Sequence, residues 1–210
     1  MKISVKPEWI TVPGLSAYNT MLDTMENRVE SIINHKNSEA VYLVEHQDVY
    51  TAGTNSSRGD IIDLGNIPII NTGRGGRITY HGPGQRVIYP ILNLSIRQKD
   101  IKQYVRHLEQ WIINSLKIIG IDAYTIAGKV GIWTQKDDID AKIGAIGIRV
   151  RKWVTFHGIS VNINPNILKY KGIIPCGISD LPVTSLEDLG IKIALKDFDT
   201  IIKNEFEKVF

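Results

Sequence analysis

The chain has 210 residues, of which 43% are hydrophobic and 22% charged, and this length predicts one globular domain over residues 1–210. The formal net charge of +3 at pH 7 is mild and scattered along the chain, which argues against nucleic-acid binding and fits a modest basic face that meets acidic proteins. The start lacks a signal peptide, and no stretch approaches the roughly 20 apolar residues of a membrane span, so a cytoplasmic protein without membrane association is expected.

In chain order, the first predicted element is a helix over residues 15–34, where apolar side chains recur at helical spacing. A buried strand is predicted at 40–45, followed by a loop at 53–66 that is rich in glycine, serine, asparagine and aspartate and is expected to be mobile. Residues 86–94 have the pattern of a strand, and Pro90 within them predicts a sheet edge or a bulge.

The second half begins with the clearest helical pattern, over residues 100–119, and Gly120 is well placed to end it. A last amphipathic helix is predicted from about residue 196 to the end. Short strands are predicted between these helices, near 130–134, 141–150 and 153–163. Strands clustered between helices predict an α/β domain of the α+β type, a mixed sheet with flanking helices.

Residues 73–85 contain five glycines in thirteen positions, which indicates positive φ angles or close approach of the backbone to a ligand. Two tight turns around a short strand would explain the pattern equally well. The same segment also carries the polar side chains Arg74, Arg77, Tyr80, His81 and Gln85, and loops of this kind are usually binding sites. The pattern is neither a Walker A loop nor a dinucleotide-binding fingerprint.

Lys142 begins a strand-like segment in which Gly144 and Gly147 would let another chain or a ligand lie against the backbone. From the residue alone, a strand-end lysine whose head reaches water is favoured. His157 lies in the next strand pattern, where a structural histidine is more common than a catalytic one. Asn162 beyond it could form a turn.

Cys176, the only cysteine, lies between Pro175 and Gly177. A single cysteine excludes a disulfide within the chain and a zinc site built from several cysteines. A Pro-Cys-Gly turn displays the thiol beside backbone N–H groups that could hold an oxyanion. A thiol is a useful nucleophile as thiolate, so a nearby cation such as Lys142 or His157 would be needed. From the residues alone, a structural cysteine stays the alternative.

Taken together, five motifs resemble the octanoyltransferases of lipoate biosynthesis, a family also called lipoyl(octanoyl) transferases. The motifs are Arg-Gly-Gly-Arg-Ile-Thr-Tyr-His-Gly-Pro-Gly-Gln at 74–85, Lys-Ile-Gly-Ala-Ile-Gly-Ile-Arg at 142–149, Thr-Phe-His-Gly at 155–158, Asn-Ile-Asn-Pro at 162–165 and Pro-Cys-Gly-Ile at 175–178. Their order and spacing agree with the family from about residue 40 to 187. Two positions depart from it: Arg77 stands where glutamine is frequent, and the 53–60 loop lacks the usual Gly-Arg-rich form.

The resemblance implies the fold of lipoate and biotin protein ligases, and it implies roles for individual residues. Cys176 would carry the acyl group as a thioester, and Lys142 would lower the pKa of its thiol, with His157 and Gly177 in support. The residues implied to contact substrate are Arg74, Gly75, Gly76, Arg77, Ile78, Thr79, Tyr80, His81, Ala145, Ile146, Gly147, Gly158, Ile159 and Ser160. Candidates for the lining of an acyl channel are Ile78, Ile143, Ile146 and Ile148, which core packing explains equally well.

The implied reaction has two steps, needs no cofactor, ATP or metal, and uses protein substrates. Octanoyl-acyl carrier protein is the donor, and apo lipoyl domains of 2-oxoacid dehydrogenase complexes and the glycine cleavage carrier protein are the acceptors. Arg149, Arg151 and Lys152 could steer such acidic partners, although a solvated strand edge explains them equally well.

Three other functions fit parts of the pattern. An ATP-dependent lipoate or biotin protein ligase shares the implied fold, but it needs no cysteine. A binding module for lipoyl domains or acyl carriers would leave Cys176 dispensable. A cysteine hydrolase would use water as the acyl acceptor and His157 as the base.

Overall fold

The computed structural model describes residues 6–177 and 181–210, apart from the side chain of Cys176. Its centre is a seven-stranded mixed sheet in the order β1-β2-β6-β10-β9-β8-β7. β1 and β2 are parallel, and every other neighbouring pair in this sheet is antiparallel. The strands are β1 (Glu8–Ser16), β2 (Ala40–His46), β6 (Gln85–Ile91), β7 (Ala123–Ile126), β8 (Lys129–Lys136), β9 (Ile139–Arg151) and β10 (Val154–Asn162).

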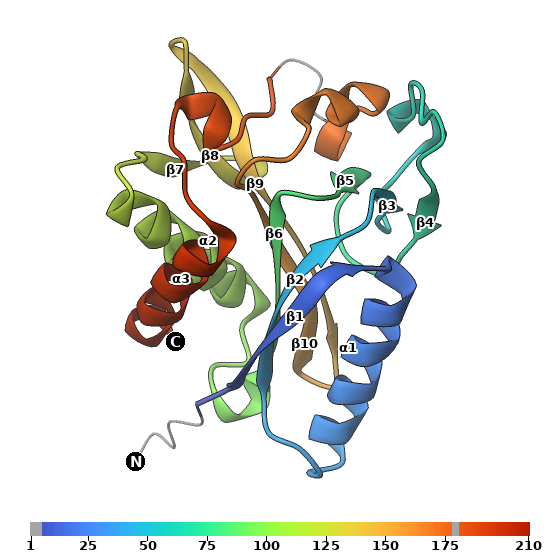
Figure 1. Ribbon diagram of the computed structural model, residues 1–210. Coiled ribbons are helices and arrows are strands. Elements are labelled where there is room, and N and C mark those ends of the chain that lie inside the picture. The colour runs from blue at the N-terminus through green and yellow to red at the C-terminus, as the bar shows by residue number, and fades with distance from the viewer. Residues whose placement is uncertain (1–5, 178–180) are drawn as a thin grey trace.

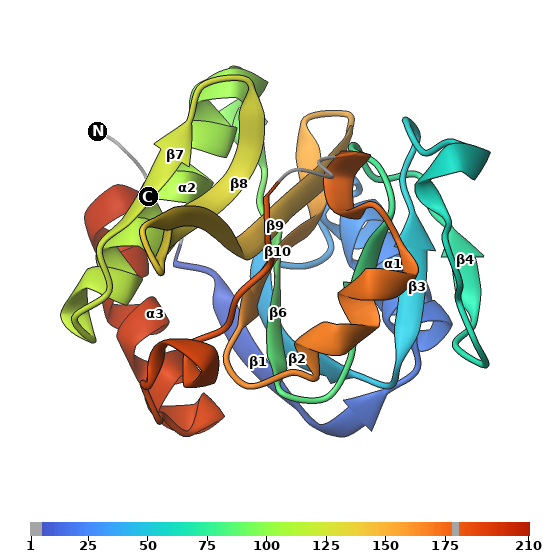
Figure 2. The ribbon, with the colours of Figure 1, turned by 90° about the horizontal axis from the view of Figure 1, so that it is seen from above.

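A second, three-stranded sheet has the order β4-β3-β5 and lies beside one end of the large sheet (Figure 1). Its strands are β3 (Val49–Ala52), β4 (Ile69–Asn71) and β5 (Thr79–His81). Seen from above, the segment around residues 167–177, drawn in orange, lies between β3 and β6 (Figure 2). Short 3-10 turns in this region are Arg58–Asp60, Ile167–Gly172 and Pro175–Gly177, and two more lie at Leu94–Ile96 and Glu187–Leu189.

The helices cover both faces of the large sheet, as Figure 1 shows. Helix α1 (Tyr18–Ile33) packs on one face through Met21, Met25 and Val29. Helices α2 (Ile101–Ile118) and α3 (Leu195–Val209) pack together on the other face. None of the helices within residues 6–177 and 181–210 is long and apolar enough to cross a membrane.

Helix α2 shows how local sequence places one of these elements. The side chain of Asp100 accepts a hydrogen bond from Gln103 N at 3.0 Å and so caps the helix start. Gly120 follows the last turn at φ = +82°, a conformation suited to glycine. Trp111 is fully buried on the inner face, and its Nε1 donates to Ile202 O at 2.7 Å. The three helices therefore lie where their apolar periodicity predicted them.

Pro90 lies in a central strand, so of the two expectations, a sheet edge or a bulge, the sheet edge is wrong. β6 runs between β2 and β10, and Pro90 is paired with Val41 of β2. Its carbonyl faces β10, where it accepts a hydrogen bond from Thr155 Oγ1 at 2.9 Å, so the missing N–H faces β10 as well. The regular pairing of β6 with β10 ends at Ile88 and Ile159, before Pro90 is reached. The sheet tolerates Pro90 because the regular hydrogen bonding between β6 and β10 is interrupted there.

The structure departs from the predicted elements in three further ways. The sequence patterns did not predict β1 or β7. They also did not predict the small sheet, whose three strands have only three or four residues each. The 53–66 segment is a loop, but it holds a 3-10 turn in which Asp60 is buried, with 2% of its surface exposed. Asn162 does not form a turn, because it is buried at the end of β10 and binds Thr184 O and Gln85 Nε2.

Candidate active site

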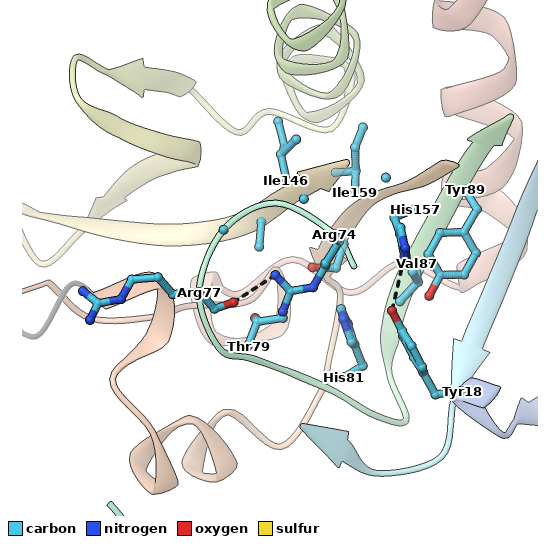
Figure 3. A pocket seen from close by; sticks show the side chains of 15 residues that line it. Tyr18, Arg74, Arg77, Thr79, His81, Val87, Tyr89, Ile146, His157 and Ile159 are labelled. Atoms are coloured by element: carbon cyan, nitrogen blue, oxygen red, sulfur yellow. Dashed lines mark hydrogen bonds between the residues drawn. The ribbon is translucent and has the colours of Figure 1, made fainter. Parts of the chain in front are cut away.

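A pocket opens between the glycine-rich segment and the large sheet (Figure 3). Its wall is formed by α1, by the loop that precedes β5, and by strands β5, β6, β9 and β10. The lining residues are Tyr18, Arg74, Gly76, Arg77, Thr79, His81, Val87, Tyr89, Ala145, Ile146, Gly147, His157, Gly158, Ile159 and Ser160. Segments far apart in the sequence thus meet at one cavity, the usual form of a small-molecule site.

Arg74 holds the glycine loop in its curled shape from inside. Its guanidinium donates to Gly75 O at 3.0 Å, to Arg77 O at 2.9 Å and to Thr51 O at 2.6 Å. Gly76 has φ = +85°, which allows the chain to turn around this guanidinium. Arg74 is therefore a structural centre of the loop as well as part of the pocket wall.

The loop rests on the backbone of β9, as the glycines of that strand predicted. Gly75 N donates to Ile148 O at 2.9 Å. A Cβ on Gly147 would stand 3.0 Å from both Arg74 Cδ and Gly75 O, so any side chain at position 147 would push the loop away. Gly147 therefore sets how closely the glycine loop approaches the floor of the pocket.

His157 is turned into the pocket at a point where β10 is paired with β9 but not with β6. Its φ of +58° is unusual for a residue with a side chain, and it lies opposite the irregular stretch at Pro90. Nδ1 lies 3.3 Å from the hydroxyl of Tyr18, and Nε2 has no hydrogen-bond partner among the described residues. Burial lowers the pKa of His157 to about 3, with the positive charges of Arg74 and Arg149 adding to the effect. His157 is therefore a neutral imidazole at physiological pH.

Two more histidines beside the pocket are also neutral. Burial lowers the pKa of His46 to about 4, and its Nε2 lies 2.7 Å from the hydroxyl of Tyr89. Burial, followed by the nearby His46, lowers the pKa of His81 to about 3. The three histidines therefore add polarity without charge beside the positively charged Arg74.

Lys142 lies inside β9 and is buried, with 5% of its surface exposed, so the interpretation that its head reaches water is wrong. Its Nζ donates to Val130 O at 3.0 Å and lies 5.3 Å from the ring centroid of Trp133. Its backbone also binds the segment that follows the cysteine, since Lys142 N donates to Pro182 O at 2.8 Å and Thr184 N to Lys142 O at 2.9 Å. A buried ammonium beside a carbonyl and an aromatic face suits a functional role.

The side chain of Cys176 lies outside the described residues, so the prediction for its thiol stays a prediction. The turn that carries it, Pro175–Gly177, is described. Gly177 has φ = +71°, and a Cβ there would stand 2.0 Å from a guanidinium nitrogen of Arg77, so the turn lies directly against a residue of the pocket wall. Gly177 N donates to Ile174 O at 3.1 Å, which means that this N–H is already used and is not free to hold an oxyanion.

All but three of the fourteen residues expected to contact substrate line the pocket. Gly75 lies within the glycine loop, while Ile78 and Tyr80 are buried in the small cluster beneath the three-stranded sheet. Of the candidates for an acyl channel, Ile146 lines the pocket and Ile143 belongs to the core under α2 and α3.

Three wall residues were not predicted: Tyr18, Val87 and Tyr89. The alternation of β6 places Val87 and Tyr89 on one face of the sheet, and a hydroxyl at the start of an amphipathic helix was the signal for Tyr18. Within the described part of the chain, no group of three or more histidine, cysteine, aspartate or glutamate side chains could hold a metal ion.

The fold is the one seen in lipoate and biotin protein ligases. A lipoate-protein ligase A solved with ATP superposes with a TM-score of 0.75 at 15% identity, over 97% of this chain and 85% of that chain. A biotin protein ligase from Aquifex aeolicus gives 0.57 at 15% identity, over 97% of this chain and 68% of that one. At such low identity these structures establish the fold.

The family follows from closer relatives. The family model of the lipoyl protein ligase A/B catalytic domain matches residues 17–207. An octanoyltransferase from Rickettsia bellii is 56% identical over 206 residues, which cover 97% of this chain and 99% of that protein. One from Rickettsia canadensis is 54% identical over the same length. The chain belongs to the lipoyl protein ligase A/B catalytic family and, within it, to the octanoyltransferases, which are acyltransferases.

Proposed function

We propose that this protein transfers the octanoyl group from octanoyl-acyl carrier protein to a lysine of apo lipoyl domains, through a thioester on Cys176. The observation that carries the proposal is the position of the Pro175–Gly177 turn against Arg77, at the wall of the one pocket in which the glycine loop, β9 and β10 meet. The identity of 54% and 56% to two octanoyltransferases supports the nature of the acyl group.

In the first step, the Cys176 thiolate attacks the thioester carbonyl of the donor, and the sulfur of the carrier protein leaves with a proton from the Lys142 ammonium, so that the carrier departs as a thiol and Lys142 becomes a free amine. One thioester replaces another, so the step is nearly balanced in free energy. The buried ammonium of Lys142, in the strand that pairs with Pro182 and Thr184, is the cation assigned to stabilise the thiolate. The lowered pKa of His157 argues against histidine in this role, since an imidazole with a pKa of about 3 carries no charge near neutrality.

In the second step, the acceptor lysine attacks octanoyl-Cys176, an amide bond forms, and the Cys176 thiolate leaves. The amine loses one proton, and Lys142 in its free-amine form accepts that proton and returns to ammonium. Conversion of a thioester to an amide is downhill, so no ATP is required.

The acyl chain and the protein partners are assigned to different parts of the surface. Ile146 and Ile159 give one side of the pocket an apolar wall for the acyl chain (Figure 3). Arg149 is exposed beside the glycine loop and stacks over Phe156, which leaves its charge available to acidic partners. Arg151 is less available, because it pairs with Glu26 at 3.1 Å.

Intact-mass measurement after incubation with octanoyl-acyl carrier protein tests the proposal. We expect one added octanoyl group that hydroxylamine removes, as for a thioester, and no addition to the Cys176→Ala variant. Addition of an apo lipoyl domain should then move the octanoyl group to a lysine. An unchanged mass with active donor contradicts the covalent mechanism. Pyrophosphate release from ATP and octanoate would support a ligase, and release of free octanoate without an acceptor would support a hydrolase.

A further inference from the structure

The 53–66 loop is tied to the cysteine turn through one buried carboxylate, that of Asp60. We propose that Asp60 is a positioning residue for the reaction: it holds Arg77 against the Pro175–Gly177 turn and balances its charge there. The inference rests on the proposed function, because it takes Cys176 as the acyl-carrying residue.

Asp60 is buried, with 2% of its surface exposed, and each of its carboxylate oxygens has a partner. Oδ2 accepts a hydrogen bond from Ser57 N at 2.8 Å and one from Arg77 Nε at 3.1 Å. Oδ1 lies 2.7 Å from Nη2 of Arg77. Two nitrogens of the Arg77 guanidinium thus bind the Asp60 carboxylate in a bidentate pair, a geometry that fixes both side chains. Ser57 Oγ accepts a further hydrogen bond from Arg77 Nη2 at 3.2 Å.

The backbone of the same loop also forms hydrogen bonds with residues 172–174, the segment that leads into the cysteine turn. Asp60 O accepts from Ile174 N at 2.8 Å, and Gly172 O accepts from Ile62 N at 2.9 Å and from Asp63 N at 3.0 Å. Ile61 and Ile173 form an antiparallel bridge. Residues 60–63 therefore serve as the support on which residues 172–174 lie, immediately before Pro175.

Arg77 closes the connection from the other side. Its Nη1 occupies the space where a Cβ on Gly177 would stand, at 2.0 Å, so the guanidinium lies against the end of the cysteine turn. One of its nitrogens therefore faces the turn, while the other two face Asp60. The glycine segment thus contacts the turn through Arg77, and the loop supports the residues that lead into it.

The charges of Asp60 and Arg77 act in opposite directions on the pKa of the Cys176 thiol. Asp60 and Arg77 together contribute almost no net charge at the turn, and Lys142, whose Nζ contacts a carbonyl and an aromatic ring among the described residues, is the cation assigned to the thiolate. Replacing Asp60 by asparagine leaves the Arg77 charge uncompensated, which favours the thiolate and lowers the pKa of the thiol. Replacing Arg77 by glutamine leaves the Asp60 charge uncompensated and raises that pKa. Both variants loosen the turn, so both should slow acyl transfer.

The test measures two quantities on Asp60→Asn, Arg77→Gln and the double variant. The first is the rate at which Cys176 reacts with a small alkylating reagent across pH, which reports the thiol pKa without any acyl donor. The second is kcat/KM for octanoyl transfer. We expect opposite shifts of the thiol pKa in the two single variants, a smaller shift in the double variant, and a loss of transfer of about 10- to 100-fold in each, as expected for a displaced reacting group. Asp60→Glu should keep most of the transfer.

The matched control is Asp199→Asn, which removes the carboxylate of another buried aspartate–arginine pair. Asp199 lies 2.8 Å from Arg86, between α3 and β6, and neither residue lines the pocket. It should lower the thermal midpoint without moving the thiol pKa. If Asp60→Asn behaves as this control does, or leaves transfer unchanged, the proposal is wrong. If the wild type is not acylated by the donor, the proposed function fails, whereas the opposite pKa shifts would still establish the contact of Asp60 and Arg77 with the turn.

Discussion

The side chain of Lys142 lies directly over Gly131: a Cβ at position 131 would stand 2.4 Å from Lys142 Cε and 3.0 Å from Nζ. The absence of a side chain at Gly131 allows the buried lysine to cross β8 and reach Val130 O and the face of Trp133. Gly131 also has φ = +135°, outside the range that residues with a side chain favour. A glycine distant in sequence from every motif thus determines where the ammonium lies.

Gly131→Ala should therefore displace Lys142 and reduce octanoyl transfer at neutral pH by about 10- to 100-fold. The backbone strain should also reduce the free energy of unfolding by about 1 kcal/mol or more. Gly128→Ala separates the two effects, because Gly128 has φ = +80° but a Cβ there would meet nothing within 4 Å. Transfer assays and thermal unfolding of both variants provide the measurement. Equal transfer rates in the two variants would show that the position of Lys142 is unimportant.

A second prediction separates Lys142 from His157 as the group that activates Cys176. Lys142→Ala should raise the thiol pKa and remove most transfer at neutral pH. Lys142→Arg keeps the charge but not a removable proton, so acylation should survive better than transfer to lysine. His157→Ala should leave thiolate formation intact, because the neutral imidazole supplies no charge.

Thiolate absorbance followed against pH distinguishes these variants. The dyad of Cys176 and Lys142 would be the wrong mechanism if His157→Ala raised the thiol pKa while Lys142→Ala left it unmoved.

A third prediction concerns the glycine loop. Gly76→Val should nearly abolish octanoyl transfer while the protein stays folded, because the new side chain enters the pocket wall. A Cβ at position 76 would have its nearest contact at 3.6 Å, so the stability cost comes from the φ of +85° and should be about 1–3 kcal/mol. Gly14→Val carries a similar penalty at φ = +67° outside the pocket and is the matched control. Normal donor binding and transfer by Gly76→Val would show that the loop is purely structural.

A fourth prediction is a loss of stability in mild acid. His46, His81 and His157 have native pKa values of about 4, 3 and 3, below the ordinary value of 6.5 for an unfolded histidine. As the pH falls from about 6.5 towards these native values, the unfolded state binds protons that the native state does not, so the free energy of unfolding decreases. In this window each histidine adds up to about 1.4 kcal/mol per pH unit to the slope of the free energy of unfolding against pH. Above about pH 6.5 its contribution to the slope falls to zero.

Urea titrations between pH 7.5 and 4.5 measure this slope. His46→Asn should give a shallower pH dependence, whatever its effect on absolute stability. His35→Asn, at an exposed position with φ = +55° that asparagine tolerates, is the control and should leave the slope unchanged. Identical slopes in the wild type and His46→Asn would contradict the assignment of His46 as a buried neutral group.

The sequence by itself determined the parts of the molecule that depend on local pattern. The apolar stripes of α1, α2 and α3 fixed which faces are buried, because a helix brings residues three and four apart onto one side. The family resemblance carried by the Pro-Cys-Gly and glycine-rich motifs pointed to most of the pocket wall, whereas residue chemistry alone left two tight turns and a structural cysteine as alternatives. The glycine within the Lys-Ile-Gly-Ala-Ile-Gly motif likewise predicted the contact between β9 and the loop, which Gly147 provides.

Only the tertiary structure decided the environment of each of these groups. Pro90 lies in a central strand because its missing N–H faces a stretch of β10 that is not regularly paired with β6, and His157 turns into the pocket from this same stretch. Lys142 is buried because Gly131 makes room for it, and Asp60 meets Arg77 because two loops fold onto the cysteine turn. Burial and charge at a site are sums over neighbours from distant segments, so charge state and orientation follow from the packing of the whole chain and not from the motif that names the residue.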